Sequence, residues 1–66
     1  MKYDWITIAI DNGGVLTTSK DVRGYYSTMN WRHRDPISGE HRTTIPDAIT
    51  SLNEELHDDA AEECDT

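Results

Sequence analysis

The stretch IAIDNGGVLTT, Ile8 to Thr18, decides how the first half of the chain folds. Ile6, Ile8 and Ile10 occupy every second position, as residues on one face of a strand do. Residues 3–10 are also rich in β-branched and aromatic side chains, which is typical of a strand. Asn12-Gly13 supplies residue types that adopt positive φ in a tight hairpin turn. The stretch therefore predicts a strand over residues 3–10, a turn at Asn12-Gly13 and a returning strand over residues 15–19.

The alternating pattern recurs between Tyr25 and Arg34, after a connection over residues 21–24. One set of side chains is mainly apolar and the other polar, which predicts a strand with one buried face. The set predicted to face inward is Tyr25, Ser27, Met29, Trp31 and His33. Residues 35–39 contain a proline and a glycine and are predicted to form a loop. Residues 40–44 are predicted to return as a short fourth strand.

A C-terminal helix is the clearest element of the sequence. Thr44 precedes Asp47 by three residues, as in a capping box, and Pro46 is tolerated in the first turn of a helix. Apolar residues then recur at helical spacing, at Ile45, Ile49, Leu52, Leu56 and Ala60. We therefore predict an α+β fold. A small antiparallel sheet of three or four strands lies within residues 3–44, and one C-terminal amphipathic helix packs on one face of it.

Charge is unevenly distributed along the chain. The net charge is −7 over 66 residues, and residues 43–66 contain eight acidic residues and no lysine or arginine. Residues 20–42 carry five of the six basic residues. Acidic side chains at the C-terminal end of a helix oppose its dipole, so we expect the helix to fray after Ala61. The prediction is a single domain over residues 1–61 and a mobile acidic tail over residues 62–66.

The opening stretch also resembles the first motif of the haloacid dehalogenase-like phosphatases. In that family an apolar strand is followed by Asp-x-Asp-Gly and then by Val or Leu and Thr. The resemblance implies that Asp11 is the nucleophile that becomes phosphorylated, while Gly13 stands where the family has its second carboxylate. The hairpin interpretation needs only local residues. We therefore interpret Asp11 as a turn residue and predict that the protein is not an enzyme.

Few residues of the chain suit a metal or a cofactor. A hairpin over residues 32–42 would place His33 and His41 across from each other, but a structural zinc site takes four ligands with nitrogen or sulfur donors. His57 and Cys64 are the other candidates, and nothing in the sequence brings them to the hairpin. We expect no metal and no cofactor. The single cysteine and the lack of a long apolar run predict a cytoplasmic protein that does not enter a membrane.

The acidic character of the predicted helix indicates a function. Four like-charge pairs are spaced i,i+4, namely Glu54–Asp58, Glu55–Asp59, Asp58–Glu62 and Asp59–Glu63. Each pair lowers the stability of the helix by about 0.2–0.5 kcal/mol. Solubility alone does not require this loss, because mixed charges would also provide it. We predict a small non-enzymatic binding protein that occupies a basic, nucleic-acid-handling surface of a partner protein such as a nuclease. In size and charge it is similar to phage-encoded anti-CRISPR and anti-restriction inhibitors.

Eight residues are predicted to bind this partner. The charge donors on the helix are Glu54, Glu55, Asp58, Asp59 and Glu62. A secondary contact on the outer sheet face is predicted for Tyr26, Arg32 and Arg34, because aromatic and arginine side chains are enriched at interfaces.

Two alternatives stay open. The segment GYYSTMNWRHR, residues 24–34, mixes aromatic and basic residues as single-stranded nucleic-acid-binding modules do, although a net charge of −7 repels a polyanion. Tyr3 and Trp5 lie opposite three isoleucines in the predicted first strand, and one helix does not cover both sides of a sheet. An exposed Trp5 face would allow a homodimer.

Overall fold

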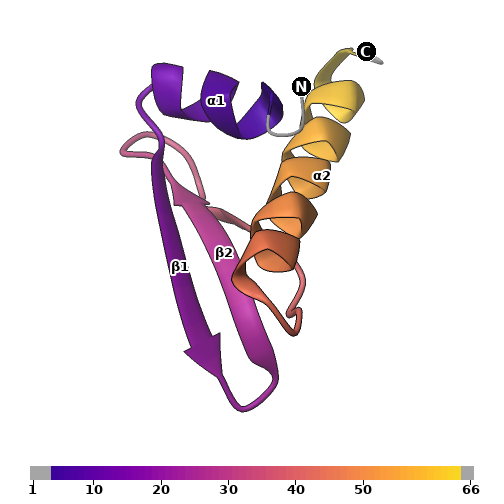
Figure 1. Cartoon of the computed structure of the whole chain (residues 1–66). Helices are drawn as coiled ribbons and strands as arrows, with labels where there is room; N and C mark the ends of the chain where they lie inside the picture. The colour runs from indigo at the N-terminus through magenta and orange to yellow at the C-terminus, as the bar shows by residue number, and fades with distance from the viewer. Residues whose placement is uncertain (1–3, 65–66) are drawn as a thin grey trace.

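The structure is a computed structural model that describes the backbone of residues 4–64 and the side chains of residues 4–59. The elements follow the order α1 (Asp4–Asp11), β1 (Val15–Asp21), β2 (Gly24–Asn30), β3 (Ile37–Ser38) and α2 (Ile45–Cys64). The strands form one antiparallel sheet in the order β1-β2-β3. Helix α2 runs along one face of the sheet (Figure 1). Helix α1 lies across the upper end of the sheet, beside the second half of α2. The predicted α+β fold with a C-terminal helix is confirmed.

The first element is a helix, so the predicted strand over residues 3–10 is wrong. Ile6 and Ala9 lie three residues apart and are buried together, which is helical spacing. Ile8 and Ile10 share the alternating pattern with Ile6, but their side chains are 47% and 46% exposed. The alternation of isoleucines suggested a strand, whereas the contacts with the rest of the fold select a helix.

The glycine pair ends α1 instead of turning a hairpin. Gly13 has a φ of 94°, a left-handed conformation that favours glycine. Its amide donates to the carbonyl of Ile10 at 3.0 Å, and the amide of Gly14 donates to the carbonyl of Ala9 at 2.9 Å. These two bonds are the Schellman motif that commonly closes a helix. Asp11 is therefore the last residue of a helix, and its predicted place in a hairpin turn is wrong.

Strand β1 forms its hairpin with β2. The register aligns Val15 with Asn30 and Asp21 with Gly24, so the predicted connection after Asp21 is a two-residue turn. Oδ1 of Asp21 accepts a hydrogen bond from the amide of Arg23 at 2.7 Å, which stabilises this turn.

The segment after β2 differs from its prediction in two places. Residues 37–38, which belong to the predicted loop, form β3 and pair with Met29 and Thr28. The predicted fourth strand over residues 40–44 is reduced to one bridge between Tyr25 and Arg42. The reason is a close approach: Gly39 lies against the backbone of Leu52, where a Cβ atom would stand 2.6 Å from the Leu52 nitrogen. Beside this contact the amide of Glu40 donates to Oγ of Ser51 on α2 at 2.8 Å instead of to β2, and the pairing with β2 returns only at Arg42.

The core lies between the sheet and α2. Met29 and Leu52 are fully buried, and Ser27 on β2 is buried as its predicted inward orientation requires. Asp47 donates its amide to Oγ1 of Thr44 at 3.3 Å, which confirms the helix cap. The helical stripe is rotated from its prediction. Ala48 and Ser51 are buried, Leu52 and Leu56 stay in the core, and Ile45 is exposed.

Two further predictions concern the ends and the membrane. The mobile acidic tail over residues 62–66 lies outside the residues whose side chains the structure describes, although the α2 backbone continues to Cys64. Across residues 4–64, neither helix has both the length and the apolar character that a membrane span needs.

Candidate functional site

The two flanks of α2 carry acidic side chains in different environments. Glu54 and Asp58 lie one helical turn apart and are exposed to solvent. Among the described residues, neither forms an ion pair. We call these two residues the acidic flank. Glu55 is half-buried, and the side chain of Glu62 lies outside the described residues.

Asp59 lies on another flank of α2 and is paired with a side chain of the same molecule. Its Oδ2 accepts a hydrogen bond from Nη2 of Arg34 at 2.9 Å. The guanidinium of Arg34 also lies over the ring of Trp31, 4.6 Å from the ring centroid. Asp59 was predicted to bind a partner together with the other helix acids, and in the structure one of its carboxylate oxygens pairs with Arg34.

A pocket of about 350 Å³ opens on this flank, between α1, residues 31–34 and α2. Both tryptophans of the chain line it. The remaining lining residues are Ile8, Ala9, Asn12, His33, Arg34, Leu56 and Asp59. Trp5 also contacts His57, with ring centroids 5.1 Å apart. Each indole therefore has a side-chain neighbour, His57 for Trp5 and Arg34 for Trp31.

Asn53 holds the two helices that form the pocket together. Its Oδ1 accepts hydrogen bonds from the backbone amides of Trp5 at 3.0 Å and Ile6 at 3.2 Å. The first amides of a helix lack partners within the helix, so a side chain of α2 caps α1 across the fold. This cap positions Trp5 at the pocket. A lone asparagine within a helical pattern gives no sequence signal for such a contact.

The predicted secondary contact does not form one surface. Tyr26 lies on the sheet face away from α2 and packs against the ring of His41 at 4.9 Å. Arg34 follows the end of β2, and its side chain reaches Asp59 on α2. Arg32 is exposed to solvent. Strand β2 ends at Asn30, so the alternation of faces no longer applies to the arginines. The aromatic residues of the predicted nucleic-acid-binding segment are likewise divided, because Tyr25 and Tyr26 point to opposite faces.

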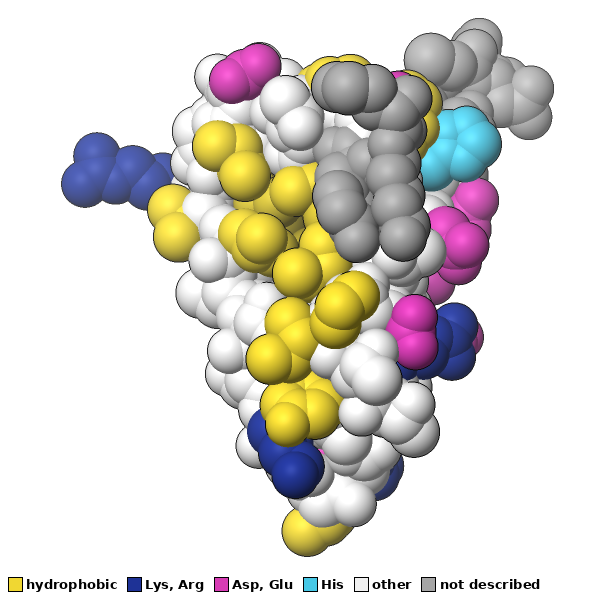
Figure 2. Space-filling model, in the orientation of Figure 1, with side chains coloured by type: hydrophobic (Ala, Val, Ile, Leu, Met, Phe, Trp, Pro, Cys, Tyr) yellow, Lys and Arg dark blue, Asp and Glu magenta, His cyan; other side chains and the backbone are white. Residues whose placement is uncertain are grey.

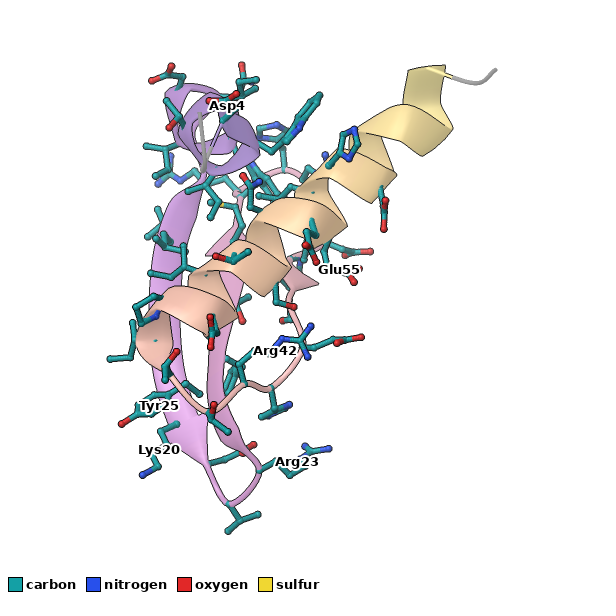
Figure 3. The ribbon with its side chains drawn as sticks, turned by 45° about the vertical axis from the view of Figure 1, so that its right-hand side comes forward. Asp4, Lys20, Arg23, Tyr25, Arg42 and Glu55 are labelled. Carbon is teal, nitrogen blue, oxygen red and sulfur yellow. The ribbon has the colours of Figure 1, made fainter. Side chains whose placement is uncertain are left out.

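Basic side chains gather at the opposite end of the molecule. Lys20 and Arg23 lie near the tip of the β1–β2 hairpin, far from Asp4 on α1, and Arg42 lies between this tip and Glu55 (Figure 3). Each has a local partner, since Lys20 lies over the Tyr25 ring at 5.2 Å and Arg42 pairs with Glu40 at 2.9 Å. Arg23 lies 3.8 Å from the carboxylate of Asp21.

Asp21 is the acidic centre of the hairpin end. Its Oδ2 lies 2.9 Å from Nε2 of His41. The hydrogen bond from the Arg23 amide is the main cause that lowers the pKa of Asp21, and His41 adds to it. The folded state therefore favours the ionised form of this carboxylate.

The phosphatase-like motif and the predicted histidine pair take other positions. Asp11 is exposed at the end of a helix, whereas the motif places its aspartate after a strand. His33 lines the pocket, and His41 lies beside Asp21 on the outer sheet face. Within the part of the chain that the structure describes, no three His, Cys, Asp or Glu side chains form a group that could hold a metal ion.

The exposed apolar residues also differ from the prediction. Trp5 is half-buried at the pocket and does not form an open sheet face. Figure 2 shows hydrophobic side chains gathered in a band that runs from α1 down toward the start of α2. In the described part of the chain, the large exposed apolar side chains are Ile8, Ile10, Val15, Val22 and Ile45.

Comparison with known proteins returns no match for this chain, whether against protein-family models, curated proteins or solved structures.

Proposed function

We propose that this protein is a small non-enzymatic binding protein that occupies a basic, nucleic-acid-handling surface of a partner protein. The acidic flank, Glu54 and Asp58, is the observation that carries the proposal. These carboxylates are exposed, stand one turn apart and form no ion pair with another described residue. Their mutual repulsion destabilises an isolated helix by about 0.2–0.5 kcal/mol, which a cationic partner would reverse.

The packing of α2 against the core supports the same function. The opposite side of the helix holds Leu52 and Leu56 in the core, so the acidic flank is already in place before a partner arrives. Groups that are preorganised lose little conformational freedom on binding, and binding is then stronger for the same contacts. Glu55 lies beside this flank, and Glu62 continues the same row in the sequence.

Long-range electrostatics support a basic partner. A net charge of −7 attracts a positively charged cleft and speeds association at low ionic strength. A partner of this kind is a nuclease or another enzyme that handles nucleic acid in the cytoplasm. Size and charge make the chain similar to phage-encoded inhibitors of defence nucleases.

The test compares two double variants that each remove two negative charges. Glu54→Gln/Asp58→Asn changes the acidic flank, and Asp11→Asn/Asp35→Asn removes two exposed carboxylates elsewhere. Binding to a panel of purified nucleases and DNA-binding proteins is measured by biolayer interferometry at low and moderate salt. We expect the first variant to lose affinity by about 2- to 30-fold, because each exposed ion pair contributes about 0.2–1 kcal/mol, and the second to lose much less.

Three results would contradict the proposal. The panel contains no binder, or affinity is unchanged between low and moderate salt, or the two double variants lose affinity equally. The last result would mean that net charge acts without a defined surface.

A further inference from the structure

We propose that the pocket between α1, residues 31–34 and α2 binds a single nucleobase, free or as a nucleoside. The pocket lies on the flank of α2 that carries Asp59, so this inference is independent of the acidic flank and of the proposed protein partner. A nucleobase is a neutral planar heteroaromatic group whose edge places a hydrogen-bond donor beside an acceptor.

The size and lining of the pocket indicate the size and shape of its ligand. A volume of about 350 Å³ lies at the small end of the range for ligand pockets. Trp5 and Trp31 provide two indole surfaces, and Ile8 and Leu56 complete the apolar lining. Tryptophan rings stack favourably on planar heteroaromatic groups of every base type. The pocket therefore suits one flat ring system and not a long chain.

The Arg34–Asp59 pair indicates which hydrogen-bonding groups the ligand carries on its edge. A guanidinium has five N–H donors, and the bond to Asp59 uses only one of them. The Asp59 carboxylate retains a second oxygen as an acceptor. Both side chains line the pocket and remain reachable, at 37% and 34% exposure. A donor group thus stands beside an acceptor group, which is the complement of a nucleobase edge.

The charges of the site favour a neutral ligand. Arg34 and Asp59 have opposite charges that cancel, so neither an anion nor a cation gains a net attraction in the pocket. The whole molecule carries −7, which repels a chain of phosphates. A free base or nucleoside meets both conditions, whereas the same base within an oligonucleotide brings repulsive phosphates with it.

Intrinsic fluorescence provides the experiment, because the two tryptophans of the protein both line the pocket. The full chain is titrated with cytidine, with its 5′-monophosphate, with a short single-stranded oligocytidine, and with benzyl alcohol, an aromatic ligand without the paired donor and acceptor. We expect saturable quenching by cytidine with a dissociation constant of about 1 mM or below. The monophosphate and the oligonucleotide bind more weakly at low salt.

Matched variants separate the pocket from the rest of the surface. Asp59→Ala and Arg34→Ala remove the polar wall, while Asp58→Ala and Arg32→Ala remove the same charges from neighbouring residues outside the pocket. Alanine has the highest helix propensity, so the two helix variants do not weaken α2 through its backbone. We expect the pocket variants to lose about tenfold or more in affinity for cytidine, and the control variants less than about twofold.

Each contrary outcome overturns the inference. Absence of saturable quenching by cytidine removes the site. Equal losses of cytidine affinity in Asp58→Ala and Asp59→Ala would mean that the pocket does not recognise the edge of the base. Equal affinities for benzyl alcohol and cytidine would mean the same. An oligonucleotide that binds more tightly than cytidine at low salt assigns the pocket to single-stranded nucleic acid instead.

Discussion

Asp58 and Asp59 are neighbours in the sequence, yet they lie on different flanks of α2 and have different surroundings. Successive residues of a helix are rotated by about 100°, so one carboxylate faces solvent and the other faces the segment after β2. Asp59 pairs with Arg34 at 2.9 Å and helps to form a pocket, whereas Asp58 pairs with no described residue. The difference shows that an acidic run on one helix is two features. Asp59 forms an ion pair within the molecule, whereas Asp58 is exposed without an ion pair to another described residue.

Both flanks depend on the third side of α2, which holds the helix in the core. Leu52→Ala is therefore expected to have the largest effect, because Leu52 is fully buried between the sheet and the helix. A buried leucine that becomes alanine loses about 2–5 kcal/mol of unfolding free energy. Urea denaturation followed by tryptophan fluorescence measures this loss. A loss below about 1 kcal/mol would mean that the flanks are not fixed by this contact.

The cap from Asn53 sharpens the comparison on the pocket side. Asn53→Ala leaves the amides of Trp5 and Ile6 without their acceptor, and we expect a loss of about 1–2 kcal/mol together with a shift in tryptophan emission. Asn53→Asp keeps an acceptor and adds a negative charge at a helix N-terminus, which is favourable. It should retain most of the stability. If the two variants unfold at the same urea concentration, the cap does not hold α1 in place.

A smaller effect compares the two neighbouring aspartates directly. Asp58→Ala and Asp59→Ala each remove one carboxylate and the like-charge pairs at i,i+4, and each gains the same helix propensity. They differ mainly in the Arg34 ion pair. We expect Asp59→Ala to be less stable than Asp58→Ala by about 0.2–1 kcal/mol in urea at low salt, and the difference should shrink as salt screens the pair. Identical stabilities would place both carboxylates in the same role.

The hairpin end offers the smallest effect and a check through pH. The amide of Arg23 lowers the pKa of Asp21 in the fold, so the ionised carboxylate stabilises the protein above its unfolded pKa of about 3.8. That stability is lost as the pH falls below this value and through the lower pKa of the folded state. The wild type should therefore lose more stability on acidification than Asp21→Asn does, as thermal unfolding at several pH values would record. Parallel losses in the two proteins would argue against the shift.

The elements that the sequence predicted correctly rest on local signals. The Thr44 cap and the helical spacing of Leu52 and Leu56 define α2 without reference to the rest of the fold. The segment before Asp11 was predicted wrongly because its alternating isoleucines fit the pattern of a strand. Ile6 and Ala9 in the same segment also fit the spacing of a helix. Only the contacts with α2 distinguish the two, and a glycine pair serves both as a hairpin turn and as a helix end.

The pocket was not predictable because it depends on contacts across the fold. Arg34 and Asp59 are 25 positions apart, and Asn53 is 48 positions from Trp5. No spacing rule links residues over such separations. The acidic run was visible in the sequence, but its division between two flanks required knowing where residues 31–34 pass beside α2.

A crossed titration tests most directly whether the two flanks have different roles. Asp58→Ala and Asp59→Ala are each titrated with cytidine and with a basic protein that binds the wild type. We predict that Asp59→Ala loses cytidine and keeps the protein, whereas Asp58→Ala keeps cytidine and binds the protein more weakly. A variant that loses both ligands while the other loses neither would contradict the separation.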